Sequence, residues 1–139
     1  MKKPVVVFAC VHNAGRSQIA AAWMRRLAGD QVTVSSGGSD PADRINPAVV
    51  ASMAEVGIDV SREQPRAWST ADMRGADVVV TMGCGDSCPV FPGIRYLDWE
   101  IEDPSGRSAE GVRPIRDEIE SRVRWLIADL GLPTAASPE

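Results

Sequence analysis

The sequence predicts an α/β domain with three α/β/α layers, in which a four-stranded parallel sheet lies between helices. Two kinds of segment support this prediction. Residues 4–9 are a continuous apolar run and residues 76–82 a strongly apolar one, both of strand length, as expected for strands covered on both faces. Elsewhere, in residues 19–27 and 115–130, apolar residues repeat at helical spacing. Strands that alternate with helices are typical of a parallel sheet.

The first part of the chain alternates in this way. After the strand at residues 4–9, the apolar residues Ile19, Trp23 and Leu27 recur every four positions and so fall on one face of a helix. Residues 31–36 are short and half polar, which favours a strand at the edge of the sheet. The glycine-rich residues 37–41 then predict a loop.

A second helix is predicted by its terminal residues. Asn46 is a typical helix cap, Pro47 suits the first helical position, and Gly57 suits the end. Residues 58–75 are polar and irregular, with one short helix expected after Thr70.

The last part of the chain adds two strands and a long helix. Residues 76–82 should lie centrally beside the first strand, and residues 94–99 form a further strand. Gly131 follows the final helix. That helix places one set of apolar residues on a single face: Ile115, Ile119, Val123, Leu126 and Leu130.

Composition limits the class of protein. The chain has 139 residues, of which 44% are hydrophobic, enough for one domain with its own core. We expect a single catalytic domain over residues 1–132 and a flexible tail over residues 133–139. No membrane span or signal peptide is recognisable, so we expect a cytoplasmic protein without a membrane partner. The net charge of −4 argues against nucleic acid as a partner.

The cysteines point to chemistry. The chain has three cysteines, an odd number, and no export signal is recognisable. We therefore do not expect a disulfide framework. In a reducing compartment they should be catalytic, metal-binding or redox-active.

The most informative segment runs from Cys10 to Ser17. It connects the end of a buried strand to the start of a helix, where backbone N–H groups converge and the helix dipole is positive. Such a loop suits an oxyanion, and Cys10 within it is a candidate nucleophile. Arg16 offers a planar fork for two oxygens, Ser17 a hydroxyl donor, and Asn13 and Gly15 tolerate left-handed backbone angles.

His12 is the only histidine of the chain and lies beside the nucleophile. The loop already supplies donors for a thiolate, so a Cys–His pair is not required. We expect His12 to pack or to line a pocket.

Cys84 and Cys88 follow the second central strand, whose end lies at the same edge of the sheet as Cys10. An extended chain would hold their Cα atoms roughly 13 Å apart, whereas a disulfide needs less than about 7 Å. Gly83 and Gly85 permit the turn that closes this distance. We favour a redox pair over two buried structural residues. Metal binding is less favoured because no second cysteine pair exists, and we expect no metal site.

Residues 98–106 also leave the end of a strand and contain four carboxylates. Asp103 is the best candidate for protonating a leaving oxygen, because Pro104 fixes the turn behind it and Gly106 frees the loop ahead. Glu100 and Glu102 should simply be solvated.

These residues resemble the low-molecular-weight protein tyrosine phosphatase fold in the Cys10–Ser17 loop, the Asp103-Pro104 turn and the order of strands and helices. With Cys84 and Cys88 added, the chain is most similar to the thioredoxin-coupled arsenate reductases built on that fold. The resemblance extends from Val5 to about Leu130.

The resemblance implies a role for each residue. Cys10 attacks arsenate held by Arg16 and the loop amides, Ser17 supports the thiolate, and Asp103 protonates the leaving oxygen. Cys84 then attacks Cys10 and expels arsenite, and Cys88 attacks Cys84. Thioredoxin reduces the resulting Cys84–Cys88 disulfide, so no bound cofactor is implied. The implied substrate-binding positions are Val11, His12, Asn13, Ala14, Gly15, Arg16 and Ser17.

The residues support this relay, because reducing As(V) to As(III) takes two electrons and two thiols that become a disulfide supply two. Phosphate and sulfate should compete with arsenate as oxyanions. Mycothiol is an alternative reductant, which the loop cysteine pair disfavours. Two other functions stay open: a phosphatase acting on tyrosyl phosphate or small phosphate esters, and a non-enzymatic protein that senses arsenite or a metal.

Overall fold

The computed structural model describes residues 3–83 and 90–134. Its sheet contains four parallel strands in the order β2-β1-β3-β4. The strands are β1 (Val5–Cys10), β2 (Thr33–Gly38), β3 (Val78–Thr81) and β4 (Arg95–Asp98). The predicted central pair, β1 and β3, and the predicted edge strand, β2, are confirmed.

Helices follow the strands as the sequence predicts. They are α1 (Arg16–Ala28), α2 (Pro47–Ala54), α3 (Thr70–Arg74) and α4 (Ala109–Asp129), with a short 3₁₀ turn at Gly29–Gln31. The Asn46 side chain caps α2 by accepting from the Ala48 N–H at 2.9 Å. The apolar repeat predicts the last helix only from Ile115 onward, whereas α4 begins at Ala109, because its first turns are mostly polar.

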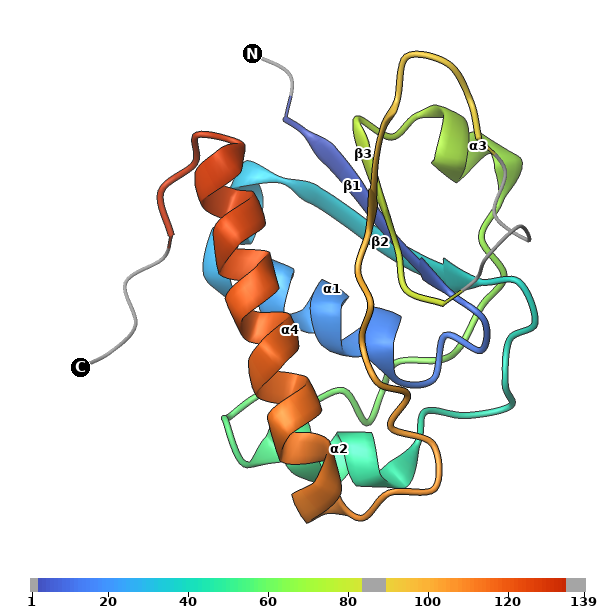
Figure 1. Ribbon diagram of the computed structural model, residues 1–139, viewed down its shortest axis with the longest axis vertical. Helices are drawn as coiled ribbons and strands as arrows, with labels where there is room; N and C mark the ends of the chain where they lie inside the picture. Colours follow the sequence, from blue (N-terminus) through green and yellow to red (C-terminus); the bar gives the residue numbers. More distant parts are fainter. Residues whose placement is uncertain (1–2, 84–89, 135–139) are drawn as a thin grey trace.

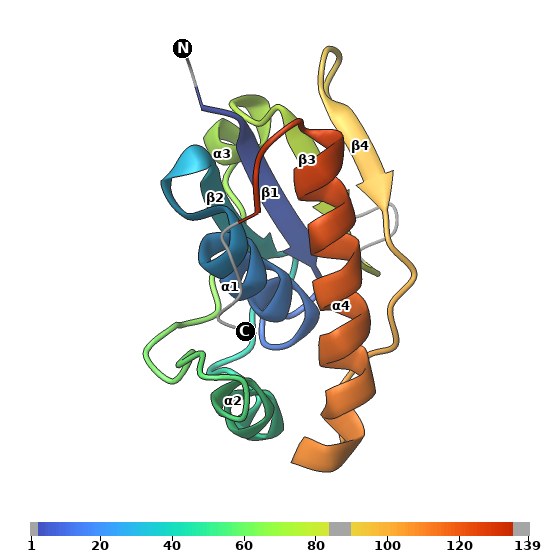
Figure 2. The same ribbon diagram turned by 90° about the vertical axis from the view of Figure 1, so that its left-hand side faces the viewer.

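The two faces of the sheet are covered unequally. Val6, Phe8 and Cys10 point from β1 to one face, where they join the core formed with α1 and α4. Figures 1 and 2 show these two helices side by side over that face, with α2 packed against α4. Val7 and Val79 point to the opposite face, which the short α3 and neighbouring loops cover. The predicted three layers are confirmed, although the second helical layer is thin.

The strand order determines where chemistry can gather. Parallel strands end at one edge of the sheet, so Cys10 at the end of β1 is flanked by Gly38 of β2 and by Met82, whose N–H donates to Ala9 O just beyond β3. The segment after β4 passes the same edge on its way to α4. No helix in residues 3–83 and 90–134 is long and apolar enough to cross a membrane.

Candidate active site

The loop between β1 and α1 is shaped by the neighbouring segment 39–46. Backbone N–H groups of that segment donate to loop carbonyls at 2.8–3.2 Å. The accepting residues are Cys10, Val11, His12 and Ala14. Because these carbonyls bond outward, the loop can turn its N–H groups inward, as a cradle for an anion requires.

The backbone of the loop fulfils one sequence prediction and corrects another. Asn13 has a left-handed conformation, with φ of 51°, and its N–H donates to the Cys10 sulfur at 3.3 Å. The prediction of a left-handed Gly15 is wrong, because its φ is −139°. Gly15 is instead required by a close approach, since a Cβ there would lie 2.7 Å from Cγ of Pro104.

Cys10 is only 3% exposed, and its Sγ lies 2.8 Å from Oγ of the fully buried Ser17. Two donors therefore surround the sulfur: the Ser17 hydroxyl and the Asn13 N–H. The amino end of α1 adds its positive dipole nearby. This environment suits a sulfur that carries negative charge.

Arg16, the first residue of α1, connects the loop to the segment after β4. Its Nη1 donates to the Ile101 carbonyl at 3.0 Å, and its Nη2 lies 3.8 Å from the Asp103 carboxylate. The Asp103 carboxylate also accepts from the Ser105 N–H at 3.0 Å, and its side chain is half exposed. The sequence predicts that Glu102 is simply solvated. In the structure, Glu102 forms an ion pair with Arg107.

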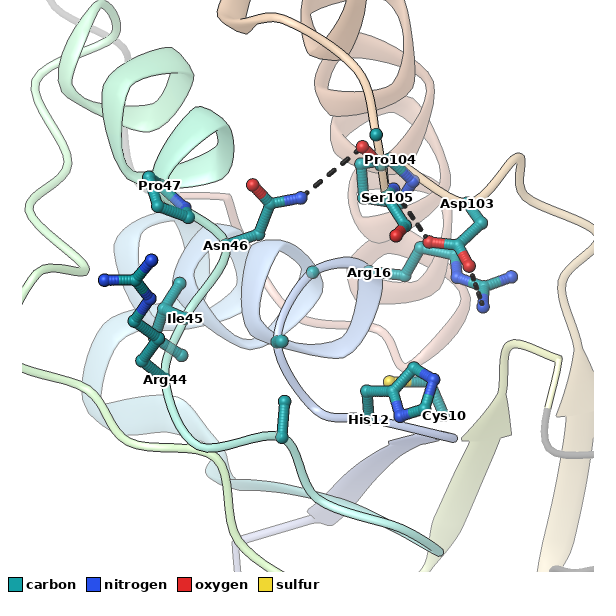
Figure 3. A pocket seen from close by; sticks show the side chains of 14 residues that line it. Cys10, His12, Arg16, Arg44, Ile45, Asn46, Pro47, Asp103, Pro104 and Ser105 are labelled. Carbon is teal, nitrogen blue, oxygen red and sulfur yellow. Dashed lines mark hydrogen bonds and ion pairs between the residues drawn. The ribbon is translucent and has the colours of Figure 1, made fainter.

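Cys10, Arg16 and Asp103 line one hollow of about 320 Å³ (Figure 3). His12 lines it too, as predicted, and its Nδ1 lies 3.0 Å from the Asp40 carbonyl. The opposite wall comes from the start of α2 and the residues before it, including Arg44.

Of the eight residues from Cys10 to Ser17, five line the hollow: Cys10, His12, Ala14, Gly15 and Arg16. The other three predicted binding residues, Val11, Asn13 and Ser17, do not line it. Asn13 and Ser17 contact the Cys10 sulfur, and the Val11 carbonyl accepts from the Asp40 N–H.

Cys84 and Cys88 lie outside the described residues. Gly83, the residue directly before Cys84, contacts Arg16: a Cβ on Gly83 would lie 2.8 Å from Nη1. Within the described part of the chain, no three His, Cys, Asp or Glu side chains gather as metal ligands.

Sequence reasoning misses several contributors. The Ile101 carbonyl that binds Arg16, and the Gln18 and Arg66 donors to Asn13, are invisible in the sequence because backbone groups and common polar residues carry no distinctive spacing. Asn46 is recognisable as a cap, but its additional bond to the Pro104 carbonyl at 3.4 Å is a tertiary contact.

Comparison with known proteins agrees with this geometry. The family model for low molecular weight phosphotyrosine protein phosphatase matches residues 5–134. A protein of Halobacterium salinarum, named provisionally as an arsenate reductase, is 42% identical over 121 residues, which are 84% of this chain and 85% of that protein. A glutaredoxin arsenate reductase of Synechocystis is 37% identical over 134 residues, covering 94% and 99%.

Among solved structures, a thioredoxin-dependent arsenate reductase of Corynebacterium glutamicum superposes with a TM-score of 0.83 at 43% identity. The match covers 93% of this chain and 62% of the Corynebacterium chain, which therefore extends beyond the matched part.

Proposed function

Because this chain belongs to the low molecular weight phosphotyrosine protein phosphatase family and resembles relatives named as arsenate reductases, we propose that it reduces arsenate to arsenite. The observation that carries the proposal is the Cys10 sulfur. It is buried and lies within hydrogen-bonding distance of the Ser17 hydroxyl and the Asn13 N–H. Cys10 lines the same hollow as Arg16 and Asp103.

The first step is attack of the Cys10 thiolate on arsenic. A bond forms between sulfur and As(V), and one oxygen leaves as water after accepting a proton from Asp103. Arg16 and the inward N–H groups of the loop hold the remaining oxygens.

The second step is the reduction. Cys84 attacks the Cys10 sulfur, and the electron pair of the sulfur–arsenic bond stays on arsenic, which leaves as arsenite. The two sulfurs supply two electrons and become a disulfide. Cys88 then attacks Cys84 and releases Cys10, and a dithiol protein of the thioredoxin class reduces the Cys84–Cys88 disulfide. The close approach of Gly83 to Arg16 supports this relay, because it places the residue before Cys84 beside a side chain that lines the hollow.

A coupled assay tests the proposal. With thioredoxin, thioredoxin reductase and NADPH, NADPH consumption should depend on arsenate and on the enzyme. Parallel assays with glutaredoxin and glutathione, and with mycothiol, identify the reductant. Phosphate and sulfate should inhibit competitively. Arsenite binding without turnover with any reductant would instead indicate a sensing protein.

Disulfide mapping tests the relay. After a single arsenate turnover without reductant, peptide mapping should find Cys84 linked to Cys88 and Cys10 free. Cys10→Ser should be inactive, and Cys84→Ser and Cys88→Ser should stop after one turnover at most. Full turnover by the latter two variants would remove the relay.

The family also favours a second candidate, hydrolysis of tyrosyl phosphate or small phosphate esters. This reaction uses Cys10, Arg16 and Asp103 and needs neither later cysteine. Comparison of kcat/KM for arsenate and for aryl phosphates, in the parent chain and in Cys84→Ser, separates the two functions.

A further inference from the structure

The structure assigns a positioning role to Gln18, which acts on the Cys10 sulfur through Asn13 and Ser17. This inference rests on Cys10 being the nucleophile of the proposed function. Gln18 does not line the hollow and makes no hydrogen bond to the Cys10 sulfur. Its side chain is buried, with 3% exposed.

The hydrogen bonds themselves identify the orientation of the Asn13 side chain. Its Oδ1 lies 3.0 Å from the backbone N–H of Arg66, which can only donate. The other end of the amide is therefore the NH₂ group, and its Nδ2 donates to Oγ of Ser17 at 2.7 Å.

This donation gives the next bond its direction. The Ser17 oxygen accepts from Asn13, so its own hydrogen is free to point to the Cys10 sulfur, 2.8 Å away. The Asn13 NH₂ group thus donates to Ser17, and the Ser17 hydroxyl donates to the sulfur. This row of hydrogen bonds favours negative charge on the sulfur, because aligned hydrogen bonds polarise one another.

Gln18 contacts the residue at the beginning of this row. Its Nε2 donates to both the backbone carbonyl and Oδ1 of Asn13, each at 3.1 Å. By bridging these two oxygens, Gln18 holds the Asn13 side chain against the Asn13 main chain, which is in the left-handed conformation. Without Gln18, Asn13 keeps only the Arg66 bond on its oxygen and is freer to turn its NH₂ group away from Ser17.

The test measures Cys10 alkylation by iodoacetamide as a function of pH. The background is the full chain with Cys84→Ser and Cys88→Ser, so that one thiol reports. Gln18→Met should slow alkylation near pH 6 by about fivefold, the factor that corresponds to one buried hydrogen bond, and should move the midpoint of the profile upward. The charged groups that share the hollow with Cys10 are His12, Arg16, Arg44 and Asp103, and all stay in place.

Gln31→Met is the matched control. Gln31 lies just beyond the far end of α1 and, like Gln18, donates from Nε2 to two oxygens, here the backbone carbonyls of Ala28 at 3.0 Å and Pro133 at 2.8 Å. It should leave the alkylation profile unchanged even if it lowers thermal stability as much as Gln18→Met does. Coinciding profiles for Gln18→Met and the parent would overturn the assignment.

A double-mutant cycle separates action through Ser17 from general loosening of the loop. In a Ser17→Ala background, Gln18→Met should have little further effect on alkylation. Effects that simply multiply would contradict the proposed route. Gln18→Leu, which is also neutral, replaces Gln18→Met if the latter fails to fold. Because alkylation needs no arsenate, these results do not depend on the identity of the substrate.

Discussion

The guanidinium of Arg16 lies 3.8 Å from the carboxylate of Asp103. The two residues lie far apart in the sequence, and they meet because the segment after β4 passes the amino end of α1. Arg16 is also anchored to the Ile101 carbonyl of that segment. In the proposed function, anion binding by Arg16 and proton donation by Asp103 are thus coupled through a single side chain.

Arg16→Lys should lower kcat/KM for arsenate by about 100-fold, the effect of losing a well-placed donor to an oxyanion. A lysine carries the charge, but it lacks the planar fork that can bind Ile101 and an oxyanion together. Steady-state kinetics in the coupled assay measure this loss. Arg44→Lys, on the opposite wall of the same hollow, is the control and should change kcat/KM little. No loss in Arg16→Lys would show that positive charge alone is sufficient, and equal losses in both variants would show that the position of Arg16 is not special.

Asp103→Asn should lower kcat by about 100-fold or more, the usual contribution of a general acid. The amide cannot protonate the leaving oxygen, whereas the turn at Pro104 should survive because the Asn oxygen still accepts from Ser105 N–H. Rapid-quench measurement of the first turnover isolates this step. Glu102→Gln, the neighbouring exposed carboxylate, is the control. An unchanged first-turnover rate in Asp103→Asn would assign the proton to another group.

Gly15→Ala should lower activity by pushing the Asp103-Pro104 turn away from the hollow. The new Cβ would lie 2.7 Å from Cγ of Pro104, too close for either atom to stay in place. We expect kcat to fall by about tenfold, a loss typical of small displacements at an active site. Adding Pro104→Ala removes the clashing atom and should restore part of the rate. No rescue would mean that Gly15 serves the loop itself.

Gly83→Ala should disturb Arg16. Its Cβ would lie 2.8 Å from Nη1, and φ of 87° is unfavourable for alanine. Gly93→Ala is a matched control, because φ there is 83° and nothing lies within 4 Å of the added Cβ. Both variants should lose about 1 kcal/mol of stability from backbone strain, measured by urea unfolding. Only Gly83→Ala should raise KM for arsenate; a similar rise in Gly93→Ala would refute the contact.

Acid sensitivity should arise partly from Glu55, at the end of α2. Hydrogen bonds from Arg113, and also from Arg116, lower the pKa of Glu55 from 4.5 to about 2. Because the folded pKa lies below the unfolded value, the stabilisation is complete above pH 4.5 and is lost as pH falls toward 2.

The stability difference between the parent and Glu55→Gln should therefore be largest at neutral pH and shrink on acidification. Urea midpoints at neutral pH and about pH 3 check this expectation. Glu118→Gln is the control, because it removes a surface carboxylate of α4 that pairs with Arg122 and leaves Glu55 in place. A difference that stays constant with pH would exclude Glu55 as a source of acid sensitivity.

The sequence is sufficient to predict most of this architecture, for identifiable reasons. Val6 and Val79 belong to apolar runs that only a doubly covered strand accommodates, and Asn46 with Pro47 marks the start of α2 clearly. Cys10 and Arg16 are recognisable because a strand, a loop and a helix surround them in a fixed order. Contacts made by backbone groups, such as the Ile101 carbonyl, leave no such pattern.

The error at Gly15 has a similar origin. Glycine serves both positive φ angles and close packing, and the sequence does not distinguish these uses. Only the approach of Pro104, almost ninety positions later in the chain, shows which of them applies.

The placement of Cys10 at the end of a strand bonded on both sides has a consequence for how chemistry on this scaffold can diversify. The strand that ends at Cys10 is bonded to β2 and β3, so its sulfur has little room to travel. Any second reactant, whether water, a phenol or another thiol, must come to it. New reactions can therefore arise from changes in the surrounding loops, while the central strand and its sulfur stay as they are.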